Sequence, residues 1–277
     1  MAGFEKWQAL GNDYVIVVRD GLGFDVTPEA VRRICDRHTG IGADGVLELS
    51  EADEPGFVAR LRIFNPDGSE AELSGNGARE AILFLRARGW TQQDEFSIQT
   101  VAGEVRPRIL SPTTCRVAMG RASLGEPGEA GGRAYVHLRI GNPQTALRVN
   151  SVDELAALDL PALGAPIEID ERFPSRTNVS FWTELAPDRI RARIFERGVG
   201  ETASSGTGAC GAAIAHVLRG GGADDGEARV TVELDGGELE VEVDEALSVH
   251  LTGWAVPVYA GAFSRPFLEE LLGASGS

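Results

Sequence analysis

Short runs of apolar residues, many of them alternating with polar ones, recur along the whole chain and predict β-strands. Helical spacing of apolar residues is rarer and predicts four helices, over 28–37, 77–89, 152–158 and 208–220. Because strands are numerous and each half also contains a long helix, the predicted fold class is α+β. The predicted strands cover residues 14–19, 45–49, 58–64, 96–100, 115–119, 135–140, 145–150, 178–185, 190–195, 230–234, 238–243 and 247–252.

The second half of the chain repeats the first. RIFNPDGSEAELSGNGARE begins at Arg62 and RIFERGVGETASSGTGACG begins at Arg193, which places Ser74 and Ser205 131 residues apart. The Gly-Asn of ALGNDYVIVV recurs in RIGNPQTALRV at an offset of 130. A passage rich in Gly, Pro and Glu, 120–133, marks the boundary between the halves. Two matched blocks at nearly one offset indicate two domains of one topology, facing each other across a cleft, although duplication for stability alone is the alternative.

Each Ser-Gly-x-Gly-Ala segment comes at the start of a predicted helix. The first N–H groups of a helix have no partner within it, and glycine lets a ligand approach the backbone, so each segment suits a carboxylate. Two such segments on one cleft would hold a carboxylate and set Ser74 and Ser205 on opposite faces of the adjacent carbon. For either serine alone, the alternative is a helix N-cap without a chemical role.

Composition removes several classes of function. The formal net charge of −16 and the pI of about 4.7 argue against binding nucleic acid, which requires clustered Lys and Arg. The three cysteines and four histidines have no metal-ligand spacing, so no metal site is expected. Lys6, the only lysine, lies in an apparent first strand, which argues against pyridoxal phosphate. Without a signal peptide or an apolar run that could cross a membrane, a cytoplasmic protein is expected.

Six segments, in order, resemble the diaminopimelate epimerase family: LGNDYVIV, RHTGIGADGV, FNPDGSEAELSGNGAR, GNPQT, RTNVSF and ERGVGETASSGTGAC. The resemblance implies two pseudo-symmetric domains, each a β-barrel-like sheet around a central helix, with the active site in the interdomain cleft. It places an N-terminal domain at 1–122, completed by 256–277, and a C-terminal domain at 123–255. It further implies a homodimer and an amino-acid isomerase without cofactor or metal, in which one cysteine removes the α-proton and another donates a proton from the opposite face.

Carried over position by position, the resemblance assigns most of a binding site for a small amino acid with a distal polar group. Glu196 matches the acid that meets the α-amino group, and Asn142 matches another polar position. The reacting carboxylate would lie on helix-start amides, and asparagines with one arginine would hold the amino acid and its distal group. The first set is Gly75, Asn76, Gly206 and Thr207, and the second is Asn12, Asn65, Asn178 and Arg197.

The departures from the family pattern fall on the chemistry. Serine stands at both catalytic cysteine positions, Ser74 and Ser205. Gln144 replaces the histidine that follows Gly-Asn-Pro in the family, and it is retained here as a predicted substrate-binding residue. Glu80 stands where a further cysteine is common. A serine hydroxyl is a far weaker acid than a thiol, and it acts as a base only when a neighbour takes its proton. The site is therefore expected to bind an amino acid, with slow or altered proton transfer.

Three functions are consistent with these residues. The first is an isomerase of the diaminopimelate epimerase type that acts on diaminopimelate or a related amino acid. The second is a different proton-shift or dehydration reaction of the same fold, with Glu196 as the acid–base group. The third is an amino-acid-binding protein without catalytic activity. For the second function, the other carboxylates considered as acid–base groups are Asp13, Asp44, Asp67 and Glu80.

Overall fold

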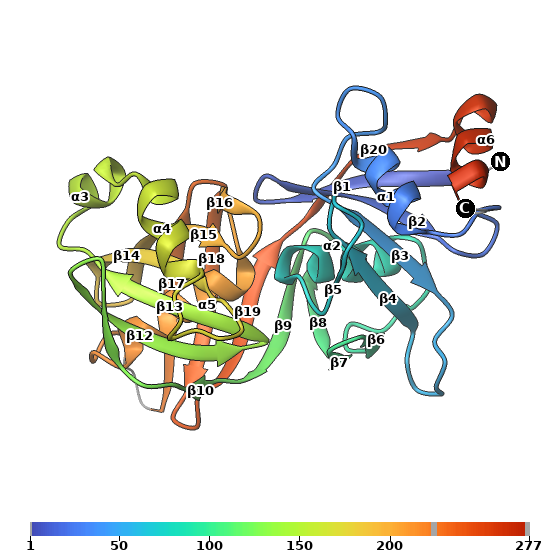
Figure 1. Ribbon diagram of the computed structural model, residues 1–277. Helices are drawn as coiled ribbons and strands as arrows, with labels where there is room; N and C mark the ends of the chain where they lie inside the picture. The colour runs from blue at the N-terminus through green and yellow to red at the C-terminus, as the bar shows by residue number, and fades with distance from the viewer. Residues whose placement is uncertain (1, 223–225, 275–277) are drawn as a thin grey trace. The chain divides into compact units, whose positions relative to one another are not determined.

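A computed structural model describes residues 2–222 and 226–274 of the chain (Figure 1). The chain divides into two compact units, one of Met1–Arg116 with Trp254–Ser277 and the other of Val117–Gly253. It passes from the first unit to the second within strand β9 (Thr114–Arg121) and returns at the end of β19 (Ser248–Trp254). Whether the stretches expected from the sequence, 1–122 with 256–277 and 123–255, fold as separate domains stays a prediction.

The first unit contains one mixed sheet with a long helix among its strands. Its order is β20-β1-β2-β3-β4-β6-β7, and the short β5 pairs with β4. The strands of this sheet are β1 (Gly3–Ala9), β2 (Asn12–Val18), β3 (Val46–Ser50), β4 (Ala59–Phe64), β5 (Glu70–Ala71), β6 (Ile98–Thr100), β7 (Gly103–Val105) and β20 (Val256–Ala262). β8 (Pro107–Ser111) also belongs to this unit, but it pairs in the larger sheet described next. The helices are α1 (Pro28–Cys35), α2 (Gly75–Ala87) and α6 (Arg265–Ala274).

The second unit contains a larger mixed sheet. Its order is β10-β12-β13-β14-β15-β17-β18-β19-β9-β8, with β11 on β12 and β16 on β15. The strands not yet given are β10 (Ser123–Leu124), β11 (Gly128–Ala130), β12 (Arg133–Ile140), β13 (Asn142–Arg148), β14 (Asn178–Ala186), β15 (Arg189–Glu196), β16 (Gly200–Thr202), β17 (Glu227–Leu234) and β18 (Gly237–Asp244), and the helices are α3 (Val152–Ala157), α4 (Leu160–Glu168) and α5 (Gly206–Val217).

The two units share one order of pairings. In the first, β1 and β2 are antiparallel, β2 and β3 parallel, β3 and β4 antiparallel, and β4 and β6 parallel. In the second, the same alternation runs through β12, β13, β14, β15 and β17. The helix follows the fourth strand and its short partner each time, as α2 after β5 and α5 after β16. The predicted α+β class and the internal repeat are therefore confirmed.

Each repeat contains a helix that is buried on all sides. Every residue from Gly75 to Leu85 of α2 is buried, as is every residue from Gly206 to His216 of α5. Helix α5 packs against β12, β13, β14, β15, β17 and β18 (Figure 1). A helix without an exposed face belongs inside its layer of strands, so both helix starts are held by the core.

The main difference from the sequence-based prediction lies at the ends of helices. Helices α2 and α5 begin two residues earlier than predicted, at Gly75 and Gly206, because Ser74 and Ser205 cap them directly. Helix α4 was not predicted, since its two prolines hide its helical pattern; Pro161 lies in the first turn, where proline is tolerated. Each predicted strand overlaps an observed one, but strands β5, β7, β8, β10, β11, β16 and β20 and helix α6 were not predicted.

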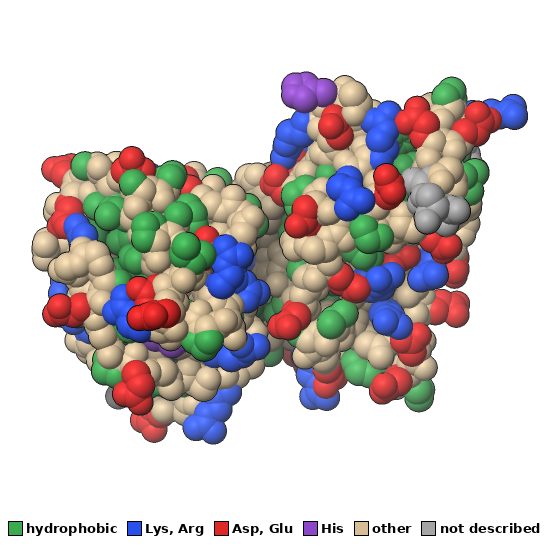
Figure 2. All heavy atoms as spheres, in the orientation of Figure 1, with side chains coloured by type: hydrophobic (Ala, Val, Ile, Leu, Met, Phe, Trp, Pro, Cys, Tyr) green, Lys and Arg blue, Asp and Glu red, His purple; other side chains and the backbone are tan. Residues whose placement is uncertain are grey.

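Charged side chains of both signs alternate on the face drawn in Figure 2. That face carries no continuous basic field on either unit, in line with the acidic composition. Among the described residues, no helix is both long enough and apolar enough to cross a membrane.

Candidate active site

Ser74 lies at the start of α2 with an extended backbone, φ −124° and ψ 124°. Its Oγ accepts a hydrogen bond from the backbone N–H of Gly77 at 3.1 Å, which is the N-cap arrangement. The same oxygen accepts a hydrogen bond from Tyr14 Oη at 3.2 Å. Ser74 is therefore the N-cap of α2, and the serine has a second partner that a cap does not require; whether it also has a chemical role stays a prediction.

Two asparagines of this unit, Asn12 and Asn76, belong to one chain of hydrogen bonds. Asn12 donates through Nδ2 to Asp44 Oδ2 at 3.0 Å, and its Oδ1 accepts from Asn76 Nδ2 at 3.2 Å. Asn76 Oδ1 accepts in turn from Arg79 Nη2 at 2.6 Å. A turn with positive φ at Leu10 and Gly11 brings the chain from β1 to Asn12. Two of the predicted binding residues, Asn12 and Asn76, are thus brought together with fixed amide orientations.

Cations surround two of the carboxylates considered as acid–base groups. Asp13 forms ion pairs with Lys6 at 2.6 Å and Arg37 at 3.0 Å, and Arg37 also pairs with Asp44 at 2.7 Å. Burial raises the pKa of Asp13, but hydrogen bonds and charge from Arg37 and Lys6 outweigh it and hold the pKa below its ordinary value. Hydrogen bonds from Ser69 lower the pKa of Asp67. Asp13 and Asp67 are therefore weak bases.

Glu80 is the opposite case. It lies in the interior of α2, fully buried, and neither carboxyl oxygen has a hydrogen-bond partner among the residues that the structure describes. Burial raises the pKa of Glu80 well above its ordinary value, and neither the charge of Arg79 nor the nearby backbone amide of Tyr14 offsets this. Burial therefore favours the protonated form of Glu80, inside the helix that Ser74 caps.

Asn65 is placed apart from this chain of amides by its local turn. It follows β4, and its side chain donates to Ser69 Oγ at 3.0 Å. Its backbone N–H donates to Ser69 O at 2.8 Å, so the turn is closed on both sides. Asn65 is half-buried, and both of these hydrogen bonds join it to Ser69.

Ser205 repeats the arrangement at the start of α5. Its φ and ψ are −143° and 121°, and its Oγ accepts from the backbone N–H of Gly208 at 3.3 Å. Ser205 is 3% exposed, and Gly206 and Thr207 are also buried. Ser205 is therefore the N-cap of α5. The two helix starts at Ser74–Gly77 and Ser205–Gly208, called the serine corners below, have the same local geometry.

Gln144 lies on β13 beside Asn142, to whose Oδ1 it donates at 2.5 Å. It is fully buried, and its Oε1 has no hydrogen-bond partner. Gly211 of α5 leaves it room, because a Cβ at Gly211 would come within 3.0 Å of Gln144 Cβ. Among the described residues, no hydrogen bond joins Gln144 to Ser205.

The remaining predicted residues of the second unit gather where β14 begins and β15 ends. Asn178 Oδ1 accepts from the backbone N–H of Arg197 at 2.8 Å, and Arg197 donates through Nη1 to Ser175 O at 2.9 Å. Glu196 accepts from Thr202 Oγ1 at 2.9 Å. This arrangement sets an anionic group and a cationic group on adjacent residues, which suits a zwitterionic ligand.

Two arginines of the repeat hold the segments that lead to the serines. Arg62 binds both carboxylate oxygens of Glu70, at 2.8 and 2.9 Å. Arg193 binds Glu201 through Nε and Nη2, at 3.0 and 2.6 Å. Each pair joins the fourth strand of its repeat to the short strand before the helix, so the repeated Arg-Ile-Phe has a structural purpose.

Tyr14 is the functional candidate that the motif comparison missed. The repeat contained a signal for it, because the offset of 130 that matches Asn12 to Asn142 also matches Tyr14 to Gln144. The Tyr14 ring lies against Gly45, where a Cβ would come within 2.5 Å of the ring atom Cε1 and 2.3 Å of Phe64 O. Gly45 thus makes room for the tyrosine.

We expect Gly45→Ala to lower the free energy of unfolding by more than about 2 kcal/mol, because one of the clashing atoms is backbone and cannot move aside. Urea denaturation at fixed pH measures this difference. Gly273→Ala is the matched control, since Gly273 is an exposed residue of α6 with open space around its Cα. Equal midpoints for the two variants would contradict the packing described for Tyr14.

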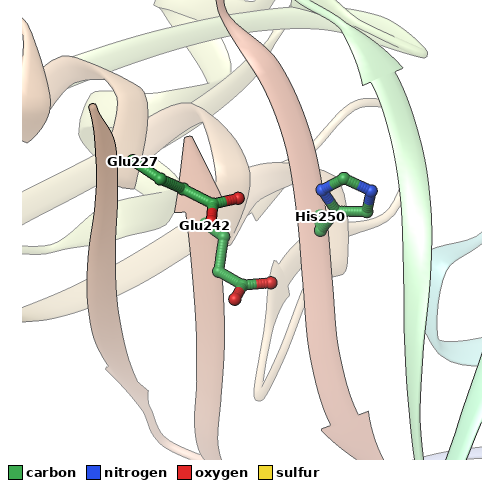
Figure 3. Close-up of side chains that lie close together, drawn as sticks. All are labelled: Glu227, Glu242 and His250. Atoms are coloured by element: carbon green, nitrogen blue, oxygen red, sulfur yellow. The ribbon is translucent and has the colours of Figure 1, made fainter. Parts of the chain in front are cut away.

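Glu227, Glu242 and His250 are close enough together to be considered as metal ligands (Figure 3). They come from the neighbouring strands β17, β18 and β19, and their ligand atoms lie within 4.8 Å of one another. Arg229 Nη2 already donates to Glu242 Oε1 at 2.8 Å, so a cation would have to displace a guanidinium. The cluster contains neither of the serine corners.

A sequence model of the family described as diaminopimelate epimerase matches residues 4–125 and 136–258. The chain belongs to the diaminopimelate epimerase family. The diaminopimelate epimerase of Aromatoleum aromaticum is 38% identical over 275 residues, covering 93% of this chain and 97% of that protein. The diaminopimelate epimerase of Pelotomaculum thermopropionicum is 37% identical, covering 94% and 98%. The prediction of an isomerase of the racemase and epimerase type is confirmed.

Solved structures share the fold of this family member at low identity. A phenazine biosynthesis protein of Bacillus anthracis has a TM-score of 0.71 at 17% identity and covers 95% of this chain and 99% of its own. A probable proline racemase of Agrobacterium radiobacter has a TM-score of 0.69 at 15% identity and covers 96% and 93%. At such identities the likeness concerns the fold alone.

Proposed function

We propose that this protein exchanges and inverts the proton on the α-carbon of diaminopimelate or a closely related amino acid, without a bound cofactor. Ser74 and Ser205 act on the same carbon, in place of the cysteine pair expected for the family. The proposal is carried by one observation: both serines cap a buried helix in the same geometry, and each leaves helix-start amides beside its hydroxyl.

The remaining roles follow from the chemistry of the side chains. The reacting carboxylate lies on the helix-start amides, and the Glu196 carboxylate pairs with the α-ammonium group. The ordered amide groups and the Arg197 guanidinium hold the rest of the amino acid. The proposed carboxylate-binding residues are Gly75, Asn76, Gly206 and Thr207, and those for the rest of the ligand are Asn12, Asn65, Asn142, Gln144, Asn178 and Arg197.

Incubation with L,L-diaminopimelate in D₂O tests the reaction directly. The proposal requires deuterium at the α-carbon by NMR and formation of the meso isomer. Saturable binding by calorimetry without any deuterium would instead support an amino-acid-binding protein. A homodimer and a cytoplasmic location are expected on family grounds and are not needed for this reaction.

We expect Glu196→Gln to weaken diaminopimelate binding by about tenfold or more, because the ammonium group loses a charged partner. Titration calorimetry measures the dissociation constant. Glu171→Gln removes a charge from an exposed position and serves as the matched control. Unchanged affinity with abolished turnover would move Glu196 from binding to acid–base chemistry, as in the second function considered from the sequence.

A further inference from the structure

The Ser74 oxygen already accepts two hydrogen bonds from the protein. One comes from the Gly77 backbone N–H at 3.1 Å and the other from Tyr14 Oη at 3.2 Å. A hydroxyl oxygen has two lone pairs and one hydrogen, so both of its acceptor sites are in use. The Ser74 hydrogen must therefore point away from both donors, and it is the part of the hydroxyl left for a ligand.

Tyr14 is held so that it can keep this contact. The residue is buried on β2, and Gly45 provides the space that its ring occupies. A buried phenol that donates to an oxygen stabilises negative charge on that oxygen more strongly than the same bond does in water. The Gly77 amide and the N-terminal end of α2 act in the same direction.

The equivalent position of the second unit does not provide this donor. Gln144 takes the place of Tyr14 in the repeat, and its amide donates to Asn142 instead. Ser205 Oγ accepts from the Gly208 N–H at 3.3 Å, and no side-chain donor among the described residues reaches it. The two corners are thus alike in backbone and different in the side chain that polarises the serine.

We propose that Tyr14 is a positioning residue that makes Ser74 the stronger acid of the two serines, so that the two directions of the reaction are inequivalent. Ser74 donates a proton to the α-carbon in one direction and takes it back in the reverse direction, while Ser205 acts from the opposite face. The catalytic part of this inference rests on the proposed function of Ser74. The difference in acidity between the corners is a property of the protein alone and can be measured without a substrate.

Single cysteine variants measure that difference. Ser74→Cys and Ser205→Cys are each prepared with and without Tyr14→Phe, and alkylation by iodoacetamide is followed against pH with peptide mass spectrometry. We expect Tyr14→Phe to slow alkylation of the Ser74→Cys thiol about three- to tenfold at pH 7, because the thiolate loses a hydrogen-bond donor. The Ser205→Cys thiol should change less than about twofold.

The native cysteines provide a background that is easy to separate. Cys35, Cys115 and Cys210 are buried, and burial raises the pKa of both Cys35 and Cys115 to about 12. Equal effects of Tyr14→Phe on the two introduced thiols, or no effect on the Ser74→Cys thiol, would overturn the proposal. If the cysteine variants fail to fold, the parent and Tyr14→Phe are compared by the second measurement.

That second measurement separates this inference from the proposed function. With L,L-diaminopimelate in D₂O, Tyr14→Phe should lower kcat for deuterium exchange about tenfold while changing KM less than about twofold. A parent that exchanges, with an equally active Tyr14→Phe, would contradict the role of Tyr14 and leave the proposed function intact. A parent without exchange would defeat the proposed function, and the thiol measurement would still decide the difference between the corners.

Discussion

The Ser74→Cys/Ser205→Cys variant is expected to exchange the α-proton of L,L-diaminopimelate about 100-fold faster than the parent, or more. The pKa of a free cysteine thiol is about 8.5, and a helix N-terminus lowers it. A serine hydroxyl is a far weaker acid than a thiol. Both serines sit at helix N-termini that are already built and buried. An increase of about 100-fold is the low end of what a positioned acid–base group contributes.

Loss of the α-proton signal in D₂O gives the rate. Ser151→Cys is the matched control, because Ser151 also caps a helix, α3, through a bond from the Glu154 N–H at 3.1 Å, but belongs to neither corner. Each substitution removes a cap that contributes about 1 kcal/mol, so thermal unfolding confirms that the variants remain folded. A folded double variant that is no faster than the parent would rule out the serines as the acid–base pair.

Glu80→Gln is expected to change how stability depends on pH. The pKa of Glu80 is raised in the folded chain, while an unfolded glutamate titrates near its model value of 4.5. Below that value Glu80 is protonated in both the folded and the unfolded state, so it adds no pH dependence to the free energy of unfolding. Above it, only the unfolded state ionises, so unfolding becomes about tenfold more favourable per pH unit until the pH passes the folded pKa. Glutamine does not ionise, so the variant lacks this slope.

Urea denaturation from pH 5 to pH 8 shows the effect as a widening advantage of Glu80→Gln over the parent. Glu72→Gln is the matched control, because Glu72 is exposed just before the same helix. The comparison depends on the trend with pH and not on the stability at one pH, since glutamine also leaves buried polar atoms without partners. Parallel curves for Glu80→Gln and the parent would mean that Glu80 is not protonated when folded.

The sequence predicted the parts of this protein that depend on local patterns. Strands followed from apolar runs, and the repeat identified both serine corners because Ser-Gly-x-Gly-Ala is a local helix-start signal. The helix starts were misplaced by two residues, because glycine is a poor helix former and the first glycine after each serine, Gly75 and Gly206, was not counted within the helix. Helix α4 was missed because proline in a first turn looks like a helix breaker until its Asp159 cap is seen.

Other features depend on residues brought together by folding. Asn12 and Asn76 were expected in the site, but the residues that orient their amides were not. Asp44, which binds Asn12, lies 32 positions away in the sequence. Arg79, which binds Asn76, lies on the next turn of α2. Glu80 has an ordinary sequence context, and its pKa is raised mainly by burial and further by the nearby charges of Asp13 and Asp44, which only folding brings close. The bond from Tyr14 to Ser74 spans 60 positions, so neither motif alone contains it.

Each of the ion pairs Arg62–Glu70 and Arg193–Glu201 anchors the start of a short stretch of chain that ends at a capping serine. From Glu70 to α2 and from Glu201 to α5, each stretch leaves an anchored strand and enters a buried helix of its own sheet. Because each stretch is anchored at both ends, we expect that its residues can be exchanged without disturbing the strands and the helix on either side. A chimaera that carries Glu201–Ser205 in place of Glu70–Ser74 would put Ser205 at the position beside Tyr14, and would let the two serine corners be compared in one structural setting.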